Sequence, residues 1–111
     1  MALAKLEKPK WHAYFDSMSK VLEGKRVEIE VDALSIGSQI EAEWLPLLGI
    51  TYDPKDDIMD VALEGLDHRI HKPREVFVDQ TAVDLSSLEV IDNEDFRHII
   101  KLRDPLMLPP P

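Results

Sequence analysis

The chain has 111 residues, of which 44% are hydrophobic and 32% are charged, values ordinary for a folded protein with one hydrophobic core. It has no cysteine, which excludes disulfides, thiolate metal sites and a cysteine nucleophile. The formal net charge is −9, and residues 27–67 carry one base against eleven acids, so this part of the chain would repel nucleic acid.

The first predicted element is an amphipathic helix at about residues 9–23. Its apolar residues recur at helical spacing and form one stripe: Trp11, Phe15, Met18 and Leu22. Pro9 suits a first helical turn, and Gly24 suits the position just past the end of a helix. We therefore expect the stripe to pack onto the rest of the core.

After the helix, the hydrophobic period changes to alternation, which predicts antiparallel strands between about residues 26 and 104. In the segment QIEAEWL, the three apolar residues that alternate, Ile40, Ala42 and Trp44, are expected to face inward. Pro46 is expected to bend or end this strand. No segment between these strands is long enough for a crossover helix, so consecutive strands are expected to pair.

Two hairpins are predicted further along. Asp53-Pro54 suits a type I turn, and the aspartates around it lack the spacing of a calcium loop. The second turn is DNED, residues 92–95, between two strand-like segments. Residues 105–111, PLMLPPP, are expected to form a Pro-rich tail.

The segment EGLDHRIHKPREVFV, residues 64–78, crowds basic residues and histidines together. His68 and His71 would converge on one metal only in a helix. Pro73 disfavours helix at Lys72, and the residues that follow are β-branched and aromatic. We therefore predict two strands with a break at Lys72-Pro73, the two histidines on opposite faces, and no metal.

The break is the surface at which we expect function, because irregular connections carry binding more often than regular elements. We predict a partner-docking patch of His71, Arg74 and Glu75, with Arg74 as its anchor. Two alternatives remain open. The stretch is a solvated connection without function, or the protein binds a small molecule or is a small enzyme that uses His68 together with the patch residues. His98 lies in an apolar row and is expected to be a satisfied core residue or an edge one. A proton-transfer role would need a carboxylate partner that the sequence does not nominate.

No dinucleotide fingerprint, phosphate-binding loop or nucleophile elbow is present. We therefore predict no catalytic residue and no cofactor, and lean against an enzyme. Few aromatic residues remain for stacking on bases, so an RNA-binding barrel is disfavoured and no nucleic-acid partner is expected. The expected partner is an unidentified protein, and the expected state is a monomer or weak homodimer. No stretch has the length of a signal peptide or membrane span, which predicts a cytoplasmic protein and no membrane partner.

Several motifs together resemble a small family of uncharacterised bacterial proteins, catalogued only as a domain of unknown function. These are the helix Trp11–Phe15, Gly24-Lys25, W-L-P-L-x-G-I-x-Y-D-P-K-D-D, H-x-I-x-x-P-R-E and L-R-D-P-L-M-L-P. The resemblance implies a bacterial source and a stand-alone small domain. It implies no reaction, ligand or catalytic residue.

The expected fold is α+β, with residues 1–111 in a single domain. An N-terminal amphipathic helix would be followed by a six- or seven-stranded antiparallel meander. We expect the sheet to be strongly bent or closed as a small SH3-like or Sm-like barrel, because an open sheet leaves two edges exposed.

Overall fold

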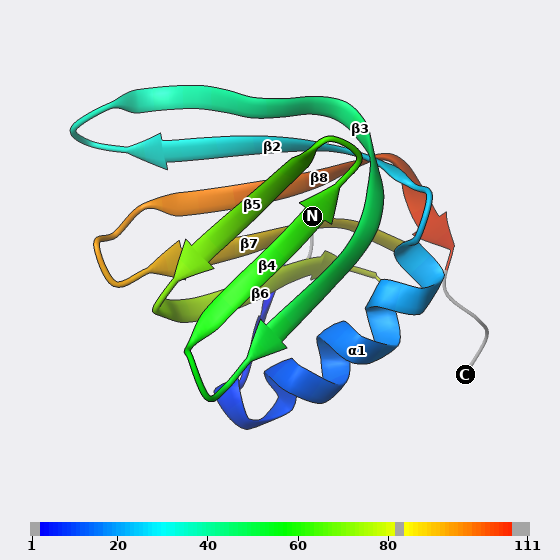
Figure 1. The fold of residues 1–111 in the computed structure, drawn as a ribbon, viewed down its shortest axis with the longest axis horizontal. Helices are drawn as coiled ribbons and strands as arrows, with labels where there is room; N and C mark the ends of the chain where they lie inside the picture. Colours follow the sequence, from blue (N-terminus) through cyan, green and yellow to red (C-terminus); the bar gives the residue numbers. More distant parts are fainter. Residues whose placement is uncertain (1–2, 82–83, 108–111) are drawn as a thin grey trace.

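A computed structural model describes residues 3–81 and 84–107 of the chain, and Figure 1 shows its fold. Its elements, in chain order, are β1 (Leu3–Leu6), a 3₁₀ turn (Lys8–Lys10), α1 (Trp11–Leu22), β2 (Arg26–Ala33), β3 (Gly37–Asp53), β4 (Ile58–Leu63), β5 (Leu66–His71), β6 (Pro73–Gln80), β7 (Asp84–Asp92) and β8 (Arg97–Met107). The strands form one antiparallel sheet in the order β1-β6-β7-β8-β2-β3-β4-β5.

The expected α+β fold is wrong, because the described chain is 67% strand and 15% helix and is therefore mostly β. A strand also precedes the helix, since Leu3–Leu6 pairs with Val76–Asp79 of β6. The described residues form eight strands rather than six or seven. A four-residue strand at the start of a chain is too short to show a clear alternation, which explains why the sequence did not predict β1.

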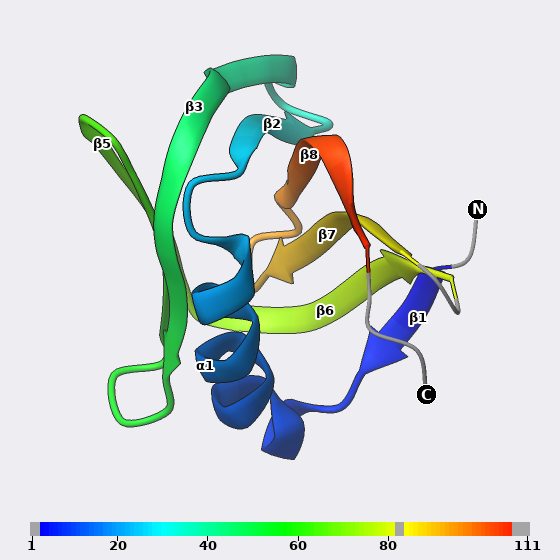
Figure 2. The same cartoon turned by 90° about the vertical axis from the view of Figure 1, so that its right-hand side faces the viewer.

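The sheet bends strongly but does not close, so the closed barrel is also wrong. Figures 1 and 2 show β3, β4 and β5 folded over in front of β6, β7 and β8, with α1 along the open side. One side of the helix lies against β1 and β6. The indole N–H of Trp11 donates to the carbonyl oxygen of Leu6 at 2.7 Å, and the Tyr14 hydroxyl donates to Oε1 of Gln80 at 3.4 Å. These contacts hold the helix to one end of the bent sheet.

On its other side, α1 satisfies the backbone of β3 where β2 no longer pairs with it. Oγ of Ser19 accepts a hydrogen bond from the N–H of Ile50 at 3.0 Å. Nδ1 of His12 lies 3.0 Å from the carbonyl oxygen of Tyr52 and donates to it. Gly49 leaves room for this approach, because a Cβ there would lie 3.0 Å from Oγ of Ser19.

The long strand β3 bends instead of ending at Pro46, and its side chains do not keep one alternation. Ile29 of β2 faces Ala42, but the next residue, Glu30, faces Ile40, so β3 contains an extra residue there, and a second register shift lies between Ala42 and Leu45. Such a bulge reverses the face that the following residues occupy. Ala42 is buried as expected, whereas Ile40 is 50% exposed and Trp44 is only partly buried with a φ of 54°. The prediction that all three face inward is therefore wrong for Ile40 and Trp44.

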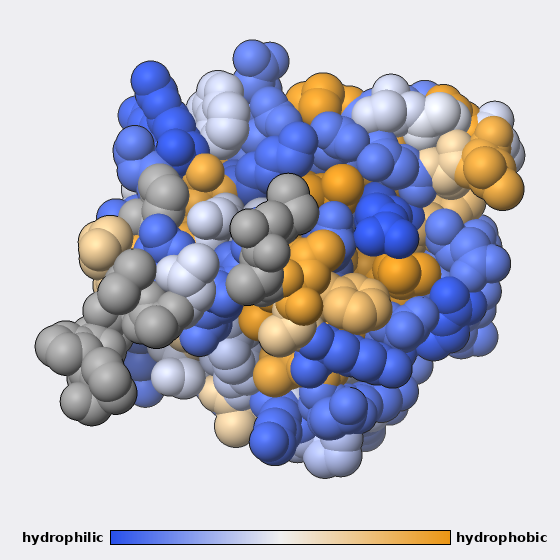
Figure 3. All heavy atoms as spheres, turned by 180° about the vertical axis from the view of Figure 1, so that it is seen from behind, coloured by the Kyte–Doolittle hydropathy of each residue, from blue (hydrophilic) through white to orange (hydrophobic). Residues whose placement is uncertain are grey.

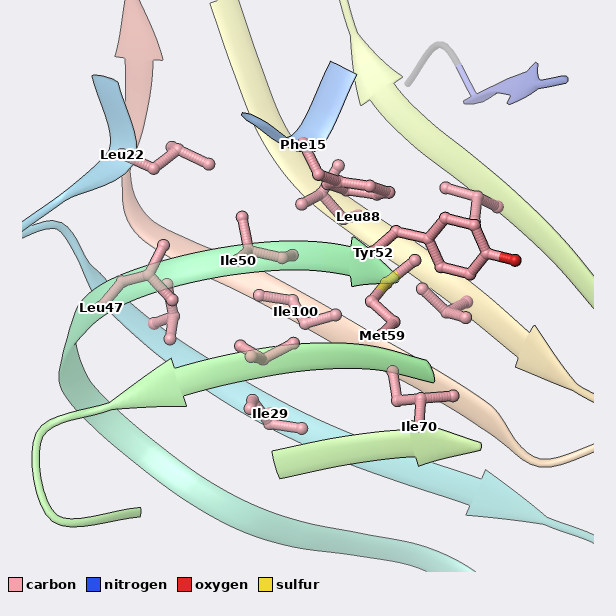
Figure 4. Close-up of a cluster of buried hydrophobic side chains, with 14 of the residues drawn as sticks. Phe15, Leu22, Ile29, Leu47, Ile50, Tyr52, Met59, Ile70, Leu88 and Ile100 are labelled. Atoms are coloured by element: carbon pink, nitrogen blue, oxygen red, sulfur yellow. The ribbon is translucent and has the colours of Figure 1, made fainter. Parts of the chain in front are cut away.

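The core lies between the two halves of the bent sheet and the helix. Figure 4 shows side chains of α1 meeting those of β2, β3, β4, β5, β7 and β8. The predicted helix stripe is confirmed: Trp11, Phe15 and Leu22 are buried, and Met18 packs against the same cluster. Gly24 follows the helix with a φ of 86°, as a helix C-terminus requires.

Both predicted hairpins are present. Oδ1 of Asp53 accepts a hydrogen bond from the N–H of Lys55 at 2.9 Å and so stabilises the turn between β3 and β4. The DNED turn joins β7 to β8. β8 extends to Met107, beyond the expected start of the tail at residue 105, and residues 108–111 of that tail lie outside the described residues.

No helix in the described part of the chain is long and apolar enough to cross a membrane.

Candidate functional site

The junction between β5 and β6 is a rigid corner of the fold. Lys72 has a φ of 52°, so the chain turns sharply between the two strands. The N–H of Lys72 donates to the carbonyl oxygen of Asp57 at 2.8 Å, and the carbonyl oxygen of Lys72 accepts from the N–H of Asn93 at 3.1 Å. The backbone of Lys72 therefore links the β3–β4 turn to the β7–β8 turn through hydrogen bonds. The predicted break at Lys72-Pro73 is confirmed, and it is fixed by the backbone of two other turns.

Arg74 and Glu75 emerge next to this corner, at the start of β6. Nη2 of Arg74 lies 2.7 Å from Oδ1 of Asp95 and 3.6 Å from Oε1 of Glu75. The other carboxylate oxygen of Glu75 lies 3.5 Å from Nζ of Lys5. The hydrogen bond to Asp95 raises the pKa of Arg74 above its ordinary value. The side chain of Arg74 remains 49% exposed, so its ion pair lies on the surface and not inside the fold.

The structure brings only part of the predicted patch into direct contact. His71 is exposed at the end of β5, on the other side of Lys72, and its imidazole makes no hydrogen bond or ion pair with a described residue. His68 lies on the opposite face of β5, where it is partly buried. The two histidines therefore do not share one face of β5, and Arg74 and Glu75 lie on the next strand, β6.

His68 instead belongs to a chain of three polar side chains inside the fold. Nε2 of His68 lies 2.9 Å from Nδ1 of His98, and Nε2 of His98 lies 3.0 Å from Oδ2 of Asp92. In the neutral tautomer of His98 whose Nε2–H donates to the carboxylate, Nδ1 of His98 accepts from Nε2–H of His68. Oδ1 of Asp92 also accepts from the backbone N–H groups of Glu94 and Phe96 at 2.9 and 3.1 Å.

This chain of side chains joins β5 to β8 across the interior, where the two strands share no backbone pairing. Of the two positions expected for His98, the core position is confirmed, with 6% of the residue exposed. Its carboxylate partner, Asp92, was not predicted from the sequence. The available signal was the DNED turn, because a short hairpin turn brings Asp92 back beside the strand that carries His98.

Burial, followed by the nearby His98 imidazole, lowers the pKa of His68 to about 4. The side chain is therefore neutral at pH 7, and its Nε2–H donates to His98 in this state. A partly buried neutral imidazole that is hydrogen-bonded to His98 supports the fold without needing a catalytic role.

We predict that the stability of the protein falls as the pH is lowered from about 6.5 to 4, partly because of His68. The unfolded chain binds the proton near the ordinary histidine pKa of 6.5, whereas the folded chain binds it only near 4, so acid favours unfolding in this window. His68→Gln retains a donor to His98 but does not titrate. Its thermal midpoint should fall less than that of the wild type over this pH range. Parallel curves for the two proteins would contradict the assignment.

A surface cleft of about 540 Å³ lies where the start of α1 meets the β3–β4 turn. It is lined by Lys8, Pro9, His12, Tyr52, Pro54 and Asp57. The Tyr52 hydroxyl donates to Oδ1 of Asp57 at 2.6 Å, and the same oxygen lies 3.6 Å from Nζ of Lys8. Burial and this hydrogen bond raise the pKa of Tyr52 to about 12. The phenol therefore keeps its proton at neutral pH and is not poised as a base.

The carboxylates of β2 that share its outer face are neutralised in part by β8. Nζ of Lys101 lies 3.2 Å from Oε1 of Glu30 and 3.8 Å from Oε1 of Glu28. The hydrogen bond to Glu30 raises the pKa of Lys101. Figure 3, which shows the face opposite to the view of Figure 1, has hydrophobic residues interspersed with hydrophilic ones.

Among residues 3–81 and 84–107, no three histidine, aspartate or glutamate side chains gather where they could hold a metal ion. The absence of a structural metal stays a prediction, as does the absence of a cofactor.

The fold and its surface thus define a small, mostly β domain with a rigid, charged corner. The chain belongs to a family of unknown function, DUF5335, whose pattern it matches over residues 2–111. It is also similar to a protein of Aquifex aeolicus (strain VF5) described as an uncharacterized protein. The two are 39% identical over 110 residues, which cover 98% of this chain and 99% of the relative. No solved structure matches the chain. The family resemblance inferred from the sequence motifs is confirmed.

Proposed function

We propose that the protein is a cytoplasmic, non-catalytic interaction domain that docks a protein partner through the patch of His71, Arg74 and Glu75. The observation that carries this proposal is the state of Arg74. Its guanidinium is half exposed, and it is held by Asp95 at 2.7 Å beside a corner that two backbone hydrogen bonds fix. A charged side chain that is both accessible and already oriented loses little freedom when a partner binds.

The chemistry of the patch favours a protein partner over nucleic acid. Arginine presents several N–H donors in a planar arrangement and is enriched at the binding hot spots of protein interfaces. The patch offers an imidazole, a guanidinium and a carboxylate, which together suit a surface of mixed charge. The net charge of −9 opposes binding to phosphate backbones, and weak or absent nucleic-acid binding at physiological salt remains our prediction.

Arg74→Ala is expected to leave the thermal midpoint nearly unchanged, because the ion pairs of Arg74 lie on the surface. It should weaken recovery of the partner when the tagged protein is used for affinity capture from its native host, followed by quantitative mass spectrometry. Arg103→Ala is the matched control, since Arg103 is also an exposed arginine but lies on β8. The control should recover the partner at the wild-type level.

Two outcomes would contradict the proposal. One is an unfolded Arg74→Ala protein, which would show that the side chain supports the fold. The other is equal recovery of every captured protein by Arg74→Ala, Arg103→Ala and the wild type, which would show that the patch does not bind.

A further inference from the structure

β5 forms one edge of the sheet and, in the part of the chain that the structure describes, pairs with β4 alone. The two-residue turn Glu64–Gly65 joins the two strands, and Leu63 faces Leu66 across it. The two residues that flank such a turn form a hydrogen-bonded pair, and hydrogen-bonded and non-hydrogen-bonded pairs then alternate along the two strands. Asp67 and Arg69 belong to non-hydrogen-bonded pairs with β4. The N–H and C=O groups of Asp67 and Arg69 therefore point away from β4 and are available to another strand.

The outward side chains of this edge carry opposite charges. Asp67 and Arg69 have side chains that are 51% and 60% exposed, and their charged atoms lie 3.7 Å apart. We infer that β5 pairs antiparallel with β5 of a second copy of the chain, with His68 of one copy opposite His68 of the other. In this register Asp67 lies opposite Arg69 of the second copy, and Arg69 lies opposite its Asp67.

Backbone geometry and charge select this register among the symmetric ones. Asp67 of one copy and Arg69 of the other can exchange two backbone hydrogen bonds, because the N–H and C=O groups of both residues point away from β4. A register centred on Arg69 would place arginine opposite arginine, and one centred on Asp67 would place aspartate opposite aspartate. Like charges directly opposite each other are destabilising in antiparallel pairs.

The neighbourhood of Asp67 also favours a cation from outside the chain. Asp60 of β4 lies close to Asp67, and burial together with this second carboxyl raises the pKa of Asp60. Oδ1 of Asp60 is buried without a hydrogen-bond partner among the described residues. Arg69 of the second copy would bring a second positive charge to a pair of carboxyl groups that now shares one arginine.

On the other face of β5, Leu66 is 37% exposed, whereas Ile70, which would lie opposite it in the second copy, is 1% exposed and stays in its own core. Two six-residue strands bury less surface than a stable dimer needs, so the self-association is weak and reversible. It does not depend on the docking patch, because Arg74 and Glu75 lie on β6.

Charge reversal tests this pairing by sedimentation velocity over a range of protein concentrations. Asp67→Arg places arginine opposite arginine in a homodimer, and Arg69→Asp places aspartate opposite aspartate. Each variant alone should dissociate roughly 10- to 30-fold more readily than the wild type, because two attractive pairs become repulsive. An equimolar mixture of the two variants restores both opposite-charge pairs and should associate as the wild type does. The double variant Asp67→Arg/Arg69→Asp should also associate, with its charges exchanged.

The inference is overturned if the wild type remains monomeric at the highest soluble concentration. It is also overturned if Arg69→Asp associates as strongly as the wild type, or if the mixture associates no better than its components. Circular dichroism of each variant serves as the folding control. If a single variant fails to fold, the double variant decides: wild-type association supports the pairing, and lost association in a folded double variant rejects it.

Discussion

Phe15→Ala is expected to lower the free energy of unfolding by about 3–5 kcal/mol, the usual effect of removing a buried aromatic side chain. Phe15 has no exposed surface, and it packs in the core that the helix shares with both halves of the bent sheet. Its loss leaves a cavity where α1 meets the sheet. The change is measured from the midpoint and slope of urea denaturation, followed by far-ultraviolet circular dichroism.

Val21→Ala is the matched control on the same helix, because Val21 is 53% exposed. Its effect should stay within about 0.5 kcal/mol, as for most surface substitutions. A small effect of Phe15→Ala, comparable to that of Val21→Ala, would show that the helix does not contribute to the core.

The second large effect is expected at Asp92. Asp92→Ala should destabilise the protein by about 2–4 kcal/mol, because several donors lose their acceptor at once. These donors are the backbone N–H groups of Glu94 and Phe96 and the buried ring of His98. The same denaturation measurement applies, and the loss should be accompanied by weaker protection of the β7–β8 turn in hydrogen exchange.

Asp92→Asn distinguishes the contribution of the turn hydrogen bonds to stability from the contribution of the carboxylate charge. The amide oxygen of asparagine can still accept from the two backbone N–H groups, so a large part of the lost stability should return. If Asp92→Ala and Asp92→Asn are equally destabilising, the carboxylate contact with His98 dominates. If neither destabilises, the link from Asp92 through His98 to His68 does not support the fold.

The parts of the fold that follow from local patterns were predictable from the sequence. The helix stripe around Phe15, the hairpin at Asp53-Pro54 and the break at Lys72-Pro73 each depend on neighbouring residues and on local turn chemistry. Each of these predictions is confirmed. The apolar row that contains His98 was likewise correctly placed inside.

The parts that were wrong depend on contacts between distant segments. β1 is defined by its pairing with β6, more than seventy residues later, and its own four residues carry no clear alternation. The extra residue in β3 that turns Ile40 outward is visible only against β2. The sheet was expected to close because its edges need cover. Instead, Ser19 and His12 of the helix satisfy part of β3, and the sheet stays open.

In the candidate site, too, the local features were predictable from the sequence and the contacts between distant segments were not. The break at Lys72-Pro73, next to Arg74 and Glu75, followed from Pro73, although both residues belong to β6 and Glu75 is only partly exposed. The backbone hydrogen bonds of Lys72 with Asp57 and Asn93, which hold this junction, could not be predicted from the sequence. Those residues lie in turns that are adjacent only in the folded chain. The docking function itself remains a proposal.

Site-specific photo-crosslinking tests the docking proposal most directly. A photo-reactive amino acid is placed at His71, or at Arg103 as the control, and the protein is irradiated in its native host. We predict one discrete crosslinked product from the His71 position that is absent from the Arg103 position and lost when Arg74→Ala is added. No crosslink from His71, or the same set of crosslinks from both positions, would contradict a partner-docking patch at this corner.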